Sequence, residues 1–208
     1  MLAFDIETIA DTTAIALLPP CEAPSNYKDQ AKIDAAVAEK TAERNAKLAL
    51  DPDCCRIVAI GYTTSDDTIW VDVCEGEASE REALCAFWRR WSRIGQRPVG
   101  FNCVGFDLPV LIQRSRILGV PPAHLELRKY GCAAVDDLML ILHHGGLTPF
   151  KGLAFWVKRL GLDVPEDTST GKDVAGFVAA DDWEAVKAHC ASDVARTLAL
   201  AQHLGVGR

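Results

Sequence analysis

The chain opens with a regular alternation of side chains. LAFDIET, residues 2–8, alternates Leu2, Phe4 and Ile6 with Ala3, Asp5 and Glu7. Because successive side chains of a strand point to opposite faces, this spacing predicts a strand with both acids on one face. An acid pair facing the interior of a sheet is costly unless a cation compensates it. The pair is therefore consistent with a metal site, and equally with a half-exposed strand that shows both acids to water.

Further strand patterns follow after a long interruption. Arg56–Thr64 and Thr68–Val73 are β-type segments, and the short turn Ser65–Asp67 predicts that they form an antiparallel hairpin. Pro98–Phe101 predicts another short strand, and Ala133–Leu142 predicts a short strand that runs into an apolar helix. This order favours an α/β fold whose sheet begins with three antiparallel strands.

Helical periodicity accounts for most of the remaining chain. Capping-box patterns predict two helix starts, at Ser79 with Glu82 and at Asp181 with Glu184. The expected helices are residues 79 onward, with the core stripe Leu84, Phe87, Trp88 and Trp91; Asp107–Leu118, ended by Gly119; Thr148–Gly161; and Asp182–Leu204, with the buried side Trp183, Val186, Cys190, Val194, Thr197 and Ala201.

Residues 10–53 form a largely helical insertion. A polar helical run covers about residues 29–50, in which Ile33 and Val37 offer a thin apolar stripe. Such a helix is marginal alone, so we expect it to lean on the domain, as a solvated packing helix or as a lid over substrate. With this insertion, residues 1–208 are expected to form a single domain without internal repeat or linker.

Composition narrows the class of protein. Apolar residues make up 49% and charged residues 25%, which is ordinary for a soluble globular protein. No apolar run reaches the roughly 20 residues that a membrane-spanning helix needs, and the acids of MLAFDIET do not fit a secretory signal. We therefore expect a cytoplasmic protein with no membrane partner. The eight cysteines lack a CxxC pair and zinc-finger spacing, so most are expected in the core.

Charge is unevenly distributed. The net charge is −7, which argues against nucleic acid, but residues 87–160 hold 11 Lys/Arg against four Asp/Glu, a local charge of +7. A basic face on an acidic protein would suit transient binding of a strand that is being degraded. Scattered, solvated side chains are an equally good interpretation.

Two further acids occupy positions that favour a role. Asp107, in GFNCVGFDLPVL at 100–111, begins a helix, whose dipole favours negative charge; an ordinary N-terminal acid is the alternative. Asp193, in HCASDVARTLAL at 189–200, lies mid-helix, where Asp is unfavourable. His189 lies one turn earlier on the same face. That face borders the apolar stripe, so the carboxylate of Asp193 is expected to be half-buried.

Three segments resemble, in this order, the exonuclease motifs of the DEDD superfamily: FDIET at 4–8, GFNCVGFDLPVL at 100–111 and HCASDVARTLAL at 189–200. They are similar to the proofreading domain of family B DNA polymerases and its stand-alone phage and bacterial relatives, whose motifs run roughly FDIET, GxNxxxFDxPxL and YxxxD. APSNYKDQAKID (23–34) and DPDCCRIVAIGY (51–62) extend the resemblance over nearly the whole chain. It implies a ribonuclease H-like mixed sheet, three antiparallel strands followed by parallel additions, flanked by helices.

The resemblance also implies two divalent cations, Mg²⁺ or Mn²⁺, which carboxylate oxygens hold well. By position, Asp5, Glu7 and Asp193 would hold one cation, and Asp5 with Asp107 would hold the other. The pair would activate the attacking water and stabilise the leaving 3′ oxygen. Only 15 residues follow Asp193, which leads us to expect a free-standing exonuclease, or one subunit of an assembly with replication or repair partners.

Three residues are assigned to substrate by the same resemblance. Asn102 matches the family asparagine of the second motif, Thr8 flanks the terminal nucleotide, and Phe106 packs against a base or, more simply, in the core. Three weaker pairs fit structural roles: Asp136/Asp137 as a helix start, His143/His144 without a partner acid at ligand spacing, and Gly145/Gly146 as a turn.

His189 departs from the family pattern. Family B has Tyr four residues before the last Asp, whereas the other branch has His five residues before it, where this chain has Ala188. One residue turns a helical position by about 100°, so His189 is not equivalent to that histidine. Imidazole accepts a proton at neutral pH more readily than phenol does. We therefore predict that His189 orients or deprotonates the water, with a bystander role as the alternative.

The sequence thus predicts a two-metal 3′–5′ exonuclease that releases nucleoside 5′-monophosphates from DNA, at single-stranded or frayed 3′ ends. An exoribonuclease is the nearest alternative, because the same four acids serve RNA and discrimination depends on contacts to the 2′-hydroxyl. A non-catalytic nucleic-acid-binding module with the same fold is the alternative from another class. The presence of all four acids argues against it.

Overall fold

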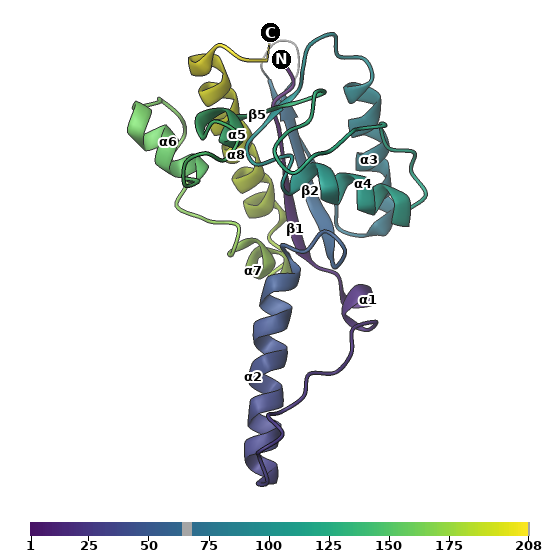
Figure 1. The fold of residues 1–208 in the computed structure, drawn as a ribbon. Helices are drawn as coiled ribbons and strands as arrows, with labels where there is room; N and C mark the ends of the chain where they lie inside the picture. The colour runs from purple at the N-terminus through teal and green to yellow at the C-terminus, as the bar shows by residue number, and fades with distance from the viewer. Residues whose placement is uncertain (64–67, 208) are drawn as a thin grey trace.

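A sheet with helices on both faces forms the body of the molecule, and one long helix projects from it (Figure 1). The computed structural model describes residues 1–63 and 68–207. The elements are β1 Phe4–Ala10, α1 Thr12–Ile15, α2 Gln30–Leu48, β2 Cys55–Thr63, β3 Ile69–Val73, α3 Glu77–Trp91, β4 Val99–Gly100, α4 Asp107–Ile117, β5 Asp136–Asp137, α5 Leu138–Leu142, α6 Leu153–Leu160, α7 Val174–Ala179 and α8 Trp183–Leu204. Within the described residues, every helix is too short or too polar to cross a membrane.

The sheet combines an antiparallel and a parallel part. β1 pairs with β2 and β2 pairs with β3, both antiparallel, which confirms the predicted start of the fold. Ala3 forms a parallel bridge with Val99, so β4 extends the sheet beyond β1, and β4 pairs with β5 in parallel. The strands therefore lie in the order β3, β2, β1, β4, β5, with β1 in the middle. The predicted turn Ser65–Asp67 lies outside the described residues.

Aromatic residues of α3 fill the core on one face of the sheet. Phe87, Trp88 and Trp91 are buried, as the helical spacing predicts. Phe87 and Trp91 contact the ring of Phe4 from β1 edge to face, with centroid distances of 5.5 and 5.9 Å. Such ring pairs add to the free energy gained by burying apolar area. The contact fixes the apolar face of β1, and therefore directs its acids to the opposite face.

Helix α8 covers that opposite face, and Gly61 of β2 sets how closely it packs. Gly61 pairs with Asp5 in the sheet. A Cβ atom at Gly61 would lie 2.7 Å from Val194 Cγ2 and 2.8 Å from Cys190 Sγ, both on α8. Only glycine allows this approach without a shift of the helix. The close packing brings Asp193 of α8 toward the acidic face of β1.

The insertion helix α2 is formed as predicted, but most of its length does not pack on the body of the domain. It points away from the body, with the preceding segment running beside it (Figure 1). Of its 19 residues, all of them described, Leu48 next to the body is the one buried side chain. Arg44 and Lys40 donate to the backbone carbonyls of Pro19 and Glu22, at 2.7 and 2.9 Å. The predicted packing is wrong, because the insertion supplies its own partner for this helix.

Three helix starts differ from the predictions, two of them by a shift of the capping position. α3 begins at Glu77, and the Ser79 hydroxyl accepts the Gly76 N–H at 3.1 Å from inside the first turn. α8 is capped by Asp182, which accepts the Ala185 N–H at 3.0 Å, and not by Asp181. For α8 the predicted residue type is right and the position is shifted by one, whereas for α3 the cap is Gly76 and the predicted Ser79 lies inside the first turn.

Helix α6 is the third, since it begins at Leu153 and not at Thr148. The preceding residues form turns around buried His143, whose Nε2 accepts the Lys151 N–H at 3.0 Å. These hydrogen bonds hold the chain in a loop where the Thr–Pro pattern predicted helix. The predicted stop at Gly161 is confirmed by its left-handed backbone, with φ of 62°. α7 was not predicted.

Candidate active site

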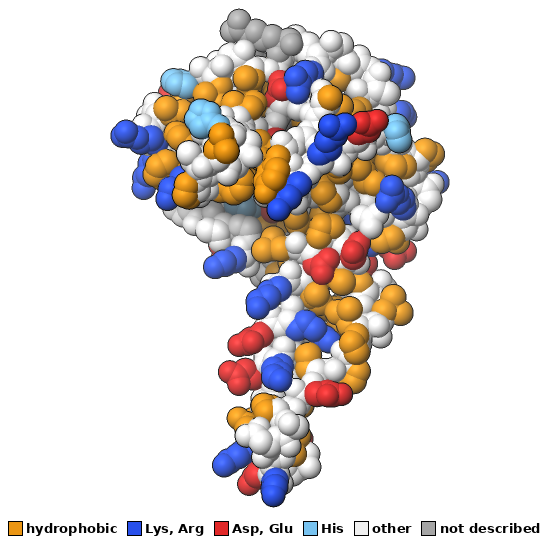
Figure 2. Space-filling model, viewed as in Figure 1, with side chains coloured by type: hydrophobic (Ala, Val, Ile, Leu, Met, Phe, Trp, Pro, Cys, Tyr) orange, Lys and Arg blue, Asp and Glu red, His pale blue; other side chains and the backbone are white. Residues whose placement is uncertain are grey.

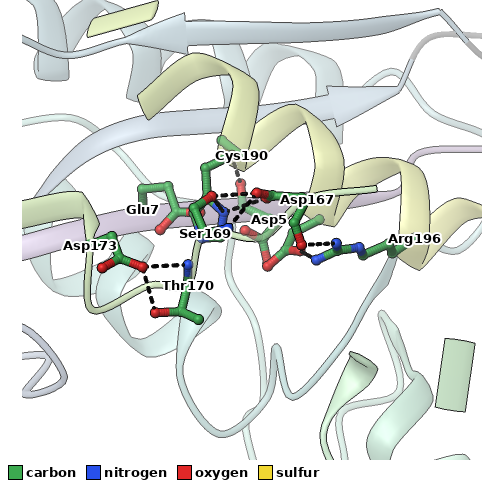
Figure 3. A network of polar contacts seen from close by, with 10 residues as sticks. Asp5, Glu7, Asp167, Ser169, Thr170, Asp173, Cys190 and Arg196 are labelled. Atoms are coloured by element: carbon green, nitrogen blue, oxygen red, sulfur yellow. Dashed lines mark hydrogen bonds and ion pairs between the residues drawn. The ribbon is translucent and has the colours of Figure 1, made fainter. Parts of the chain in front are cut away.

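The four predicted acids meet where β1, α4 and α8 come together. Asp5 and Glu7 lie on β1, and Figure 3 shows both beside Cys190 of α8 and the loop that carries Asp167. Asp107 is buried at the first position of α4, where its carboxylate lies near the backbone N–H groups of Asp107 and Ile6. Asp193 is half-buried on α8, as expected. The structure therefore joins acids that are up to 188 positions apart in the sequence.

Burial and mutual repulsion act on these carboxyl groups. Burial, followed by the charges of Asp107, Glu7 and Asp193, raises the pKa of Asp5 well above its usual range. Burial and the charges of Asp193 and Asp107 do the same to the pKa of Glu7. Burial raises the pKa of Asp107 to about 7, although backbone hydrogen bonds lower it. A group of carboxylates that oppose each other's ionisation is a fitting receptor for a divalent cation.

A β-bulge lies at the acid pair. Glu7 pairs with Ala59 of β2, whereas the next residue, Thr8, pairs with Ile57, so that one residue of β2 is left between them. Bulges of this kind redirect side chains and are common beside active sites. The hydroxyl of Thr8 is buried and donates to the Ala49 carbonyl at 2.6 Å. Thr8 thus ties β1 to the end of the insertion.

The turn that leads into Asp107 is held by Asp137. Asn102 adopts a φ of 58°, and its backbone N–H donates to Asp137 Oδ1 at 3.1 Å. The Val104 N–H donates to Asp137 Oδ2 at 3.0 Å. Asp137 also caps α5, which confirms the structural role predicted for this pair. Phe106 is half-buried against the main core, directly before Asp107.

His189 lies among acids on both sides of its ring. It is 3% exposed, and its Nδ1 is 2.7 Å from Asp167 Oδ2 and 3.0 Å from Ser169 Oγ. Its Nε2 is 3.6 Å from Glu7 Oε1. The predicted placement of His189 on the same face as Asp193 is confirmed, because Glu7, His189 and Asp193 each offer a ligand atom within 4.8 Å of the other two.

Asp167 is the site residue that the sequence prediction missed. It lies in the segment 163–173, which was predicted only as a polar loop. Its Oδ1 accepts the Ser169 N–H at 2.8 Å, a local turn that the spacing Asp-x-Ser indicates. Burial raises its pKa, but hydrogen bonds from Ser169 and His189 outweigh burial and bring the pKa below its usual value. The sequence of the loop indicates the local turn at Asp167. It does not indicate that the loop lies beside His189.

Arg196 supplies a positive charge next to the acids (Figure 3). Its Nη1 donates to Asp193 Oδ1 at 2.8 Å, and its Nη2 donates to the Asp167 carbonyl at 3.1 Å. One side chain therefore positions an acid of α8 and fastens the loop over it. Thr170 and Asp173 close the same loop with hydrogen bonds of 2.8 and 2.9 Å.

A second group of ligand atoms within 4.8 Å of one another comes from Asp5, Glu7 and Cys190. Glu7 belongs to both groups, whereas the resemblance implied that Asp5 would be the shared residue. Burial raises the pKa of the Cys190 thiol well above its usual range, and the thiol contacts the Asp5 carbonyl at 3.9 Å. Cys190 is thus a core residue, in line with the expectation for most of the cysteines.

Two arginines of the basic segment 87–160 are engaged within the protein. Arg114 is buried in ion pairs with Glu80 and Asp11, so it is not a contact for nucleic acid. Arg90 lies over the ring of Tyr62, 4.2 Å from its centroid. On the face in Figure 2, Lys and Arg side chains are spread over the body and α2. The interpretation as scattered side chains is favoured on this face.

Comparison with known proteins first gives a family and a relative. Residues 50–129 match a family model described as a predicted 3′–5′ exonuclease related to the exonuclease domain of PolB. The uncharacterized protein MJ0365 of Methanocaldococcus jannaschii is 36% identical over 129 residues, which cover 60% of this chain and 68% of that protein. The matched family segment includes Asp107 but lies between the other acids.

The fold is also similar to that of a solved polymerase. The family B DNA polymerase from the hyperthermophilic archaeon Pyrobaculum calidifontis aligns with a TM-score of 0.63 and 21% identity. The alignment covers 98% of this chain but only 24% of the polymerase, so the chain corresponds to one part of that protein. This likeness shows the fold, whereas the family model and the archaeal relative identify the chain as a member of the family of predicted 3′–5′ exonucleases related to the exonuclease domain of PolB.

Proposed function

We propose that this protein hydrolyses phosphodiester bonds at the 3′ end of DNA with two divalent cations, Mg²⁺ or Mn²⁺, and releases nucleoside 5′-monophosphates. The observation that carries the proposal is the convergence of Asp5, Glu7, Asp107 and Asp193 in a buried group that favours a cation. The strand order β3, β2, β1, β4, β5 supports a ribonuclease H-like fold as part of it.

Each acid has a distinct place in this proposal. Asp5, Glu7 and Asp193 would hold one cation, and Asp5 with Asp107 the other. Bound there, the cations would supply an activated water and stabilise the charge on the leaving 3′ oxygen. The chain's own part is to position these oxygens: Gly61 sets the distance of α8, and Asp137 holds the turn that delivers Asp107.

Substrate contacts are proposed for the residues around the acids. Asn102 and Phe106 lie in the turn before α4, where the terminal nucleotide would reach Asp107. Thr8 would act through the bulge next to Glu7, since its hydroxyl is already donated to Ala49. A single-stranded or frayed 3′ end suits this arrangement, because Glu7 and Asp107 are buried between β1, α4 and α8 and a paired end would have to open to reach them.

The test is a nuclease assay on 5′-labelled and 3′-labelled oligonucleotides of DNA and RNA, with Mg²⁺, Mn²⁺ or a chelator. Shortening from the 3′ end and release of mononucleotides are expected with metal. Asp5→Ala should lower kcat/KM at least about 10³-fold, since it removes a ligand of both cations. His124→Ala, in an exposed loop, is the matched control. A wild-type rate for Asp5→Ala would overturn the proposal, and RNA as the preferred substrate would replace DNA in it.

A further inference from the structure

The surroundings of His189 differ on the two sides of its ring. Both nitrogens face carboxylates, but only Nδ1 is within hydrogen-bonding distance of one. Ser169 donates its hydroxyl to Asp167 Oδ1, which leaves Asp167 Oδ2 to accept the proton of Nδ1 at 2.7 Å. An imidazole that keeps its proton on Nδ1 presents the lone pair of Nε2 outward. Asp167 therefore sets the tautomer of His189 as well as its orientation.

The lone pair of Nε2 is directed at the acids. Glu7 Oε1 lies 3.6 Å from Nε2, which is too long for a hydrogen bond. The ring is almost fully buried, and its Nε2 faces the carboxylates of Glu7 and Asp193. An imidazole lone pair beside two carboxylates is a suitable ligand for a divalent cation.

The distances fit a coordination shell. Two ligand atoms that are each about 2.1 Å from one ion lie roughly 3 to 4.2 Å apart. The separation of 3.6 Å between Nε2 and Glu7 Oε1 falls in this range, and an oxygen of Asp193 lies within 4.8 Å of both. A carboxylate bound to the far nitrogen of a metal-ligating histidine is the usual outer-shell arrangement, and Asp167 provides it.

We propose that His189 Nε2 binds a divalent cation directly, together with Glu7 and Asp193, with Asp167 as the positioning residue. The inference rests on the proposed function, since it concerns the cation held by two of the same acids. It changes the ligand set from oxygen alone to oxygen with one imidazole nitrogen. Mg²⁺ and Mn²⁺ both accept oxygen ligands, but Mn²⁺ is a first-row transition-metal ion and tolerates an imidazole nitrogen better than Mg²⁺ does, although it binds such ligands most weakly of that series. An imidazole in the ligand set therefore shifts the preference of the site from Mg²⁺ toward Mn²⁺.

The proposal excludes one other role for the same atom. Nε2 has a single lone pair, so it cannot bind a cation and accept a proton from water at the same time. A histidine that acted only as a proton acceptor would leave the affinity for Mn²⁺ almost unchanged when removed. A ligand would not, because its loss removes a bond to the ion.

Metal binding to the whole chain tests this without any substrate. We expect calorimetric titration to show Mn²⁺ bound at least tenfold more tightly than Mg²⁺. His189→Ala should lower the Mn²⁺ affinity at least tenfold and affect Mg²⁺ less. Asp167→Ala should lower the Mn²⁺ affinity between about 10- and 100-fold, as for other outer-shell partners. His124→Ala controls for a general effect of removing a histidine, and thermal unfolding checks that each variant is folded.

Pulsed electron paramagnetic resonance of bound Mn²⁺ gives a readout that a purely structural role would not move. A directly bound nitrogen is expected in the wild type and in His124→Ala, and its signature should be lost in His189→Ala. Mn²⁺ without nitrogen coupling, or no Mn²⁺ binding at all, would overturn the ligand assignment. In the first case, metal-dependent release of nucleotides would still support the exonuclease proposal. Nitrogen coupling in a protein that cleaves neither DNA nor RNA would support the ligand assignment and remove the exonuclease proposal.

Discussion

Two groups of buried charges in this molecule are built on opposite principles. The first joins α3, α4 and the end of β1 through Arg114, which is 2% exposed. Its guanidinium binds Glu80 with two parallel hydrogen bonds of 2.7 and 2.8 Å, and binds Asp11 with a third of 2.8 Å. This bidentate geometry is the strong form of an Arg–carboxylate pair. Here the protein carries its own cation.

The second group contains the four acids of the proposed site. Its permanent cation among the described residues is Arg196, which binds Asp193 at the edge of the group. The pKa values of the carboxyl groups differ between the two groups. Thr13 and Arg114 outweigh burial and lower the pKa of Asp11, whereas burial and neighbouring acids raise the pKa of Asp5. Uncompensated charge therefore distinguishes the proposed metal site from an ion-pair network that holds helices together.

Removing the internal cation should have the largest effect. We expect Arg114→Met to destabilise the fold by about 3–5 kcal/mol, because it leaves Glu80 and Asp11 buried without their partner. Chemical denaturation at neutral pH measures this loss. The effect on the acid site should be small in the fraction that stays folded.

The double variant Arg114→Met/Glu80→Gln serves as the control. The amide introduced by Glu80→Gln keeps an oxygen for the Ile57 N–H, which donates to Glu80 at 3.0 Å, and carries no charge. Much of the lost stability should therefore return. If the single and double variants are equally unstable, lost packing explains the effect and the charge argument is wrong.

The sequence predicted the acid group better than the ion-pair network. Asp5 and Glu7 interrupt an apolar strand, and Asp193 occupies an unfavourable helix position, so each departs from a local rule. Arg114 and Glu80 obey their local rules as ordinary helix residues. Their pairing arises only when α3 packs on α4, which no local pattern reveals.

The same reasoning explains the other outcomes. The strands and most helices followed from periodicity, and the central stripe Phe87, Trp88 and Trp91 followed from spacing. The direction of α2 could not be predicted, because its apolar stripe indicates that the helix packs on something but does not identify the packing partner. Asp167 was missed since a loop residue has no periodic neighbour that would place it beside His189.

Removing a charge from the group of four acids should raise the stability of the protein, whereas removing the charge of Arg114 should lower it. At pH 8, above the pKa of about 7 of Asp107, we expect Asp107→Asn to stabilise the metal-free protein by about 1–2 kcal/mol. The amide retains an oxygen for the backbone donors and removes one repelling charge. Thermal unfolding should show a rise of roughly 3–6 °C.

Bound metal should reverse the order of stability, so that the wild type becomes more stable than Asp107→Asn. An ion at 100 times its Kd stabilises a protein by about 2.7 kcal/mol, and the variant has lost one of the proposed ligands. Saturating Mn²⁺ should therefore stabilise the wild type more than Asp107→Asn. Asp163→Asn, at an exposed position, controls for the change in net charge. A metal-free Asp107→Asn protein that is less stable than the wild type would show that Asp107 supports the fold more than it strains it.

The smallest effect is expected at Asp11, where the two kinds of contact can be separated by pH. Asp11 Oδ1 accepts from the Thr13 N–H and hydroxyl at 2.9 and 2.7 Å, while Oδ2 accepts from Arg114 at 2.8 Å. Asn caps a helix about as well as Asp does, so Asp11→Asn keeps the first contact and weakens the second. We expect a loss of about 1 kcal/mol at pH 7.

The pH dependence of that loss is what separates the two contacts. Because the folded pKa of Asp11 is lowered, its charge stabilises the protein above the unfolded pKa of about 3.9, and this contribution disappears as pH falls through the folded value. Urea titrations of the wild type and Asp11→Asn should therefore differ at pH 7 and converge as the pH falls below the lowered, folded pKa of Asp11. Asp29→Asn, at the exposed N-cap of α2, should show no such convergence. A gap at Asp11 that stays constant down to acid pH would assign its effect to the helix cap, and would leave Glu80 as the one carboxylate that Arg114 stabilises through charge.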